Sequence, residues 1–107
     1  MTEVRTQDEL RRILQGHRFV LVYVTGDNCG VCSAIKPRIA ALLARYPALY
    51  GVEVNAHHHP KPAAQLSIFT IPAVLFFYDG REQLREARYF SLTELEQRIA
   101  RVLELAG

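Results

Sequence analysis

The sequence holds two cysteines, and both lie in the stretch NCGVC at residues 28–32. This stretch follows a continuous apolar run at residues 19–24 and precedes a segment whose apolar residues recur at helical spacing. The thiolate is the reactive form of cysteine, and the unpaired N–H groups at a helix N-terminus stabilise it. We therefore expect Cys29 to be the more acidic thiol and the nucleophile.

The spacing of Cys29 and Cys32 lets one thiol finish a reaction that the other begins. The Cys29 thiolate attacks a disulfide and forms a mixed disulfide, and Cys32 releases the captured sulfur by closing an internal bridge. The alternative, that both are small buried hydrophobic residues, agrees less well with their position directly after an apolar strand. The pattern therefore predicts thiol-disulfide exchange, with Cys29 and Cys32 as the catalytic residues.

Length and composition indicate the class of protein to which this chemistry belongs. The 107 residues suffice for one domain, 1–107, and half are hydrophobic while 22% are charged, as in ordinary globular proteins. The net charge of +2 comes without a long basic block, so we expect no nucleic-acid partner. The N-terminus is charged from Glu3 and no apolar run could span a bilayer, so we expect no membrane partner and a cytoplasmic location, where thiols stay mostly reduced.

Helical and strand patterns alternate along the chain and predict the elements that position the cysteines. In order, we expect a helix opened by Thr6 and Glu9, a strand at 19–24, a helix that contains Pro37 and ends before Pro47, a strand at 51–55, a turn-rich loop at 57–62, a short helix at 63–66, a strand at 73–78, an antiparallel strand at 81–89 and a helix opened by Ser91 and Glu94. This order favours a mixed sheet with helices on both faces. Right-handed crossovers then place the cysteines where the first strand meets the next helix.

With these surroundings the chain resembles the thioredoxin family from about residue 4 to residue 105. The matching features are Cys29-Gly30-x-Cys32 for the family's Cys-Gly-Pro-Cys, Pro37 for the proline that kinks the following helix, Thr70-Ile71-Pro72 for the loop with a cis-proline, and Asp79-Gly80 for the hairpin turn. A C-x-x-C motif between a strand and a helix, with these companions, is a specific signal. The resemblance implies a three-layer α/β/α thioredoxin-like fold with a central mixed sheet of four to five strands.

The resemblance also implies a function and its partners. We expect a thiol-disulfide oxidoreductase that reduces protein or small-molecule disulfides, takes part in electron transport and cell redox homeostasis, and receives electrons from an external thiol reductase. No bound cofactor or metal is expected, and we expect a monomer. The implied substrate contacts are Asn28, Gly30 and Val31 beside the reactive sulfur and Thr70, Ile71 and Pro72 in the cis-proline loop. Without the cysteines, Pro72 would equally well mark only the start of a strand.

Several positions depart from the family pattern, and they predict a specialised relative. Asn28 stands where Trp is usual and Val31 where Pro is usual, which alters partner choice and redox potential in a direction that the sequence does not indicate. Tyr23 stands in the place of a buried Asp, and Gly51 in that of its Lys partner, so proton handling must differ. Arg88 stands at a groove glycine, where it narrows the substrate path or selects acidic partners.

A second class of function remains open, that of a redox-inactive or metal-binding interaction module. The run His57-His58-His59 motivates it, because two imidazoles and the two thiolates would complete a tetrahedral zinc site. Adjacent histidines in a turn point in different directions, however, and the loop at His57 would have to reach Cys29. Disulfide reduction is therefore the preferred interpretation.

Overall fold

The computed structural model describes residues 1–107 and is built around a five-stranded mixed sheet. The strands lie in the order β1-β3-β2-β4-β5, and their bounds are β1 Thr2–Glu3, β2 Phe19–Thr25, β3 Leu49–Asn55, β4 Ala73–Tyr78 and β5 Arg81–Ala87. The first three in this order run parallel, whereas β4 pairs antiparallel with both β2 and β5. The prediction of a mixed sheet of four to five strands is confirmed.

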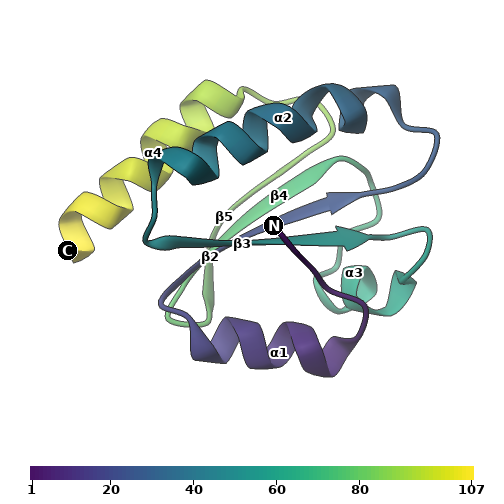
Figure 1. Ribbon diagram of the computed structural model, residues 1–107, viewed down its shortest axis with the longest axis horizontal. Helices are drawn as coiled ribbons and strands as arrows, with labels where there is room; N and C mark the ends of the chain where they lie inside the picture. Colours follow the sequence, from purple (N-terminus) through teal and green to yellow (C-terminus); the bar gives the residue numbers. More distant parts are fainter.

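Four helices cover the two faces of this sheet. Their bounds are α1 Gln7–Gly16, α2 Gly30–Arg45, α3 Pro60–Gln65 and α4 Leu92–Ala106. Figure 1 shows α2 and α4 on one face and α1 and α3 on the other, which is the three-layer arrangement that was predicted. No helix is both long and apolar enough to cross a membrane.

Strand β2 occupies the centre of the sheet because every one of its side chains is apolar or small enough to be buried. All seven residues are buried. Successive side chains in a strand point to opposite faces: Val20, Val22 and Val24 join the core beneath α1 and α3, and Leu21 and Tyr23 join the core beneath α2 and α4. The buried strand β2 therefore gives a rigid base to the cysteine stretch, which follows its carboxyl end.

Side-chain caps set the start of the two amphipathic helices, as predicted. The Thr6 hydroxyl accepts a hydrogen bond from the Glu9 backbone N–H at 3.1 Å, and the Ser91 hydroxyl accepts one from the Glu94 N–H at 3.1 Å. Each satisfies one of the N–H groups that a helix leaves unpaired in its first turn.

The main differences between the structure and the predicted elements are the following. Strand β1 was not predicted, because two exposed residues carry no pattern and are held only by pairing with β3. Strand β3 begins at Leu49, two residues early, and β5 ends at Ala87. Helix α3 begins at Pro60 inside the predicted loop, since a proline in the first turn loses no helical hydrogen bond.

Candidate active site

Cys29 and Cys32 form a disulfide at the start of α2, and the two sulfur atoms have different surroundings. Cys29 is the N-cap residue, and its Sγ accepts a hydrogen bond from the Cys32 backbone N–H at 3.2 Å. Cys29 is half-buried, whereas Cys32 is 2% exposed. A partner in solution can therefore reach the first sulfur, and the second is reached through the first.

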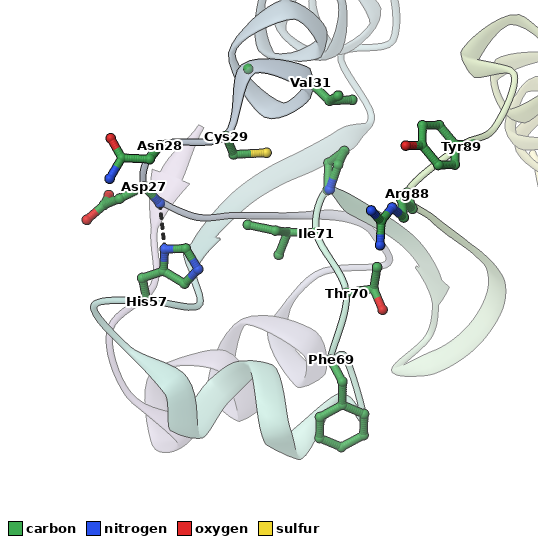
Figure 2. Close-up of a pocket in the computed structure, with 12 residues that line it drawn as sticks. Asp27, Asn28, Cys29, Val31, His57, Phe69, Thr70, Ile71, Arg88 and Tyr89 are labelled. Carbon is green, nitrogen blue, oxygen red and sulfur yellow. Dashed lines mark hydrogen bonds between the residues drawn. The ribbon is translucent and has the colours of Figure 1, made fainter.

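An open groove of about 430 Å³ lies beside Cys29. Figure 2 shows the Cys29 sulfur directed into it. All six predicted substrate contacts line the groove together with Cys29: Asn28, Gly30, Val31, Thr70, Ile71 and Pro72. Cys32 does not line it.

The far wall of the groove is the loop before β4. The Ile71–Pro72 peptide bond is cis, as the resemblance implied. Pro72 is buried, and its carbonyl accepts a hydrogen bond from the Arg88 backbone N–H at 2.7 Å. This bond ties the loop to the end of β5, so residues far apart in the sequence face the same sulfur.

The sequence did not identify four further groove residues, namely Asp27, His57, Phe69 and Tyr89. His57 was noted only as part of the histidine run, and the other three carry no motif. The one available signal was the position of Asp27, two residues before Cys29, because the others depend on which loops the fold brings together.

Tyr23 lies beneath the disulfide and is fully buried. Its phenol donates a hydrogen bond to the Cys32 carbonyl at 2.7 Å and lies 3.3 Å from the Thr25 hydroxyl. Burial raises the pKa of Tyr23, because desolvation disfavours the phenolate. Tyr23 is therefore a hydrogen-bond donor at neutral pH and not a base.

The prediction that Gly51 is the partner position of Tyr23 is wrong. The residue opposite Tyr23 on β3 is Glu53, while Gly51 pairs with Leu21. The Glu53 carboxylate forms an ion pair with Lys36 Nζ of α2 at 3.1 Å, so a carboxylate and an ammonium group do lie near this end of the sheet.

Asp27 is held by a polar network on the opposite wall of the groove. Its backbone N–H donates to His57 Nδ1 at 2.8 Å. Its carboxylate accepts from Asn55 Nδ2 at 3.2 Å and lies 2.6 Å from His58 Nε2. The hydrogen bonds from Asn55 and His58 lower the pKa of Asp27, so this carboxylate is charged and already engaged.

The three histidines do not assemble with the cysteines as a zinc site would require. His57 reaches the backbone of the cysteine loop, but His58 contacts Asp27, and His59 Nε2 lies 4.0 Å from Glu3. The structure contains no group of three or more His, Cys, Asp or Glu side chains arranged to hold a metal ion. The interaction or metal-binding alternative is not favoured.

Comparison with known proteins agrees with this geometry. A model of the thioredoxin family matches residues 1–101. Thioredoxin-like protein YdfQ of Bacillus subtilis is 33% identical over 105 residues, which cover 98% of this chain and 94% of that protein. A thioredoxin of Chlamydia trachomatis is 35% identical over 63 residues, 59% of this chain and 62% of that protein. Among solved structures, Fasciola hepatica thioredoxin superposes with a TM-score of 0.86 at 26% identity, covering 94% of this chain and 98% of the other.

The sequence motif, the fold and the relatives converge on one chemistry. The C-x-x-C pair lies at disulfide distance at the start of a helix, on a fold whose solved neighbours include thioredoxins. The chain belongs to the thioredoxin family, and its Cys29–Cys32 pair makes it a thiol-disulfide oxidoreductase of that family.

Proposed function

We propose that the chain reduces disulfides in other proteins, with Cys29 as the attacking thiolate and Cys32 as the resolving thiol. One observation carries this assignment of roles: Cys29 caps α2 at the wall of an open groove, and Cys32 is buried behind it. The accessible sulfur at the helix N-terminus has the N–H groups that stabilise a thiolate. The shielded sulfur has access to its neighbour and to little else.

The reaction transfers two electrons and two protons to the substrate. The Cys29 thiolate attacks one sulfur of the substrate disulfide; that S–S bond breaks, and the departing sulfur takes up a proton from water. Cys32 then loses its proton to water and attacks Cys29 Sγ, which forms the Cys29–Cys32 bond and releases the second substrate sulfur as a thiolate that takes up a proton from water. The structure shows the oxidised product of this cycle.

An external thiol reductase completes the cycle in this proposal. Its thiolate attacks the Cys29–Cys32 bond at Cys29, the more accessible sulfur, and two electrons return the pair to the dithiol. No group bound to the chain is required for this exchange. We place the activity in the cytoplasm, as part of electron transport and redox homeostasis, with the chain acting as a monomer.

The six groove residues named as substrate contacts support an extended substrate segment across Cys29. Asn28, Gly30 and Val31 lie on the helix side of the groove. Thr70, Ile71 and Pro72 lie on the loop side. A segment between them has its disulfide beside the Cys29 sulfur, and the backbone of Thr70 and Ile71 is available for main-chain pairing of the kind that extended peptides make.

Reduction of insulin disulfides tests the proposal, with dithiothreitol as the electron source and three proteins: the unchanged chain, Cys29→Ser and Cys32→Ser. We expect both variants to lose turnover. When the reduced proteins are freed of dithiothreitol and then mixed with insulin, only Cys32→Ser should retain a covalent complex with substrate, because its Cys29 still attacks but no second thiol releases the product. Mass spectrometry identifies that mixed disulfide. Equal rates in all three proteins would refute the proposed function, and a complex trapped in Cys29→Ser would reverse the two roles.

A further inference from the structure

One end of the groove and the hollow beside it carry two arginines that have no acidic partner. Arg88 lines the groove, and an adjoining hollow of about 370 Å³ shares Val31, Arg88 and Tyr89 with it and adds Arg38. Neither Arg38 nor Arg88 forms an ion pair, whereas Arg45 and Arg85 pair with Glu96 and Glu82. This end of the substrate path is therefore positively charged.

The single acidic residue that lines either hollow is Asp27. Figure 2 shows it on the side of Cys29 away from Arg88. Its carboxylate contacts Asn55 and His58 and forms no ion pair with either arginine. The two ends of the groove differ in charge, with Cys29 between them.

Apolar side chains are exposed along the same path. Val31 is 48% exposed, Phe69 86% and Tyr89 78%, and these three are among the five large hydrophobic residues that the molecule exposes. Exposed apolar side chains that gather on one surface mark an interaction site more often than a random surface does. The Arg88 guanidinium lies 5.4 Å from the centre of the Tyr89 ring, within the range of a cation–π contact.

The backbone of Arg88 indicates that the cation is kept at a cost. Arg88 has a φ of +66°, a left-handed conformation in which glycine is favoured and a side chain is strained. Its N–H is fixed to the Pro72 carbonyl. Strain at a position beside a reactive group is a reason to look for a function of the side chain.

We propose that the preferred substrates are disulfides in acidic polypeptide segments. An Asp or Glu side chain near the attacked cysteine binds the Arg88 guanidinium, whose planar fork matches a carboxylate. An apolar residue of the same segment rests on Val31 and Tyr89, and Arg38 extends the positive field. This inference rests on the proposed function and names its substrate class.

Two synthetic peptides with the same disulfide, one flanked by Glu and the other by Lys, test the inference. The reduced chain should react about fivefold faster with the Glu peptide, which is the upper range for one exposed charge pair. The ratio of the rates with the Glu and Lys peptides should fall to about one in Arg88→Gln. It should fall equally in Arg88→Gly, where glycine suits the left-handed backbone. It should also fall in about 0.5 M salt, where charges are screened beyond roughly 4 Å.

Arg101→Gln is the matched control, because it removes the same charge from an exposed position on α4 that lines neither hollow. It should keep the full preference. An equal loss in Arg101→Gln would assign the effect to net charge and overturn the role of Arg88. Glutathione disulfide is a second substrate for comparison. If it reacts as fast as the Glu peptide and loses as much rate in Arg88→Gln, Arg88 recognises any small anionic disulfide, and the preference for polypeptide segments is overturned.

The outcomes separate this inference from the proposed function. Equal rates for the two peptides in the unchanged chain overturn the acidic preference and leave disulfide reduction intact. If neither peptide is reduced, the proposed function fails, and NMR titration of the oxidised chain with each peptide still decides the preference because binding needs no thiol chemistry. Tighter binding of the Glu peptide, lost in Arg88→Gln, supports the inference, and equal binding refutes it.

Discussion

At the scale of single residues, the active site divides two tasks between two sulfurs by burial. Cys29 is accessible and caps a helix, while Cys32 is buried above the phenol of Tyr23. The resemblance placed a buried acid where Tyr23 stands. Because burial raises the pKa of Tyr23, the phenol does not take up the Cys32 proton near neutral pH, and its role is to hold the Cys32 carbonyl.

Replacement of Tyr23 by Phe separates these two roles. The variant keeps the ring in the core but loses the hydrogen bond to the Cys32 carbonyl, so we expect the free energy of unfolding to fall by about 1 kcal/mol. The rate of insulin reduction should stay within about twofold, since Tyr23 takes no proton in this mechanism. Urea unfolding of the oxidised chain and the insulin assay measure the two effects. A tenfold loss of rate in a folded variant would instead make the phenol part of proton transfer.

At the scale of elements, β3 and α2 pack so closely that one glycine governs their distance. A Cβ added at Gly51 would overlap the Leu43 side chain of α2, whereas one added at Gly16 meets no other atom within 4 Å. Cys29 caps α2 and Cys32 lies in its first turn, so the position of this helix on the sheet also positions the cysteines. The absence of a side chain at Gly51 is thus explained by packing and not by proton handling.

The pair Gly51→Ala and Gly16→Ala tests this packing. In Gly51→Ala the new methyl group must displace Leu43, and overpacking of this kind typically costs about 1–3 kcal/mol. In Gly16→Ala the helix C-terminus has room, and alanine should leave stability unchanged or raise it by up to about 1 kcal/mol. Thermal unfolding of both variants measures the difference. Equal midpoints would mean that Leu43 adjusts freely.

At the scale of the whole molecule, features encoded locally were predictable from the sequence and long-range contacts were not. The apolar run of β2, the caps at Thr6 and Ser91 and the cysteine spacing each depend on a few adjacent residues, and the structure contains all of them. The two-residue strand β1 and the register of Glu53 opposite Tyr23 depend on pairing between distant segments. For the same reason Phe69 and Tyr89, which carry no motif, emerge as groove residues only in the fold.

Paired carboxylates on the surface predict how the stability of the whole chain responds to acid. The hydrogen bond from Arg85 lowers the pKa of Glu82, and that from Arg45 lowers the pKa of Glu96. A carboxylate with a lowered pKa in the folded state stabilises the fold above its unfolded pKa, and this contribution is lost as the pH falls through the folded value. Stability should therefore decline below about pH 4.5, where the unfolded chain binds more protons.

The substitutions Glu82→Gln and Glu96→Gln should flatten this decline, whereas Glu104→Gln, at an exposed glutamate without an ion pair, should not. Urea midpoints between about pH 7 and about pH 3 test this, and a decline of equal size in all three variants would place the acid sensitivity in other groups.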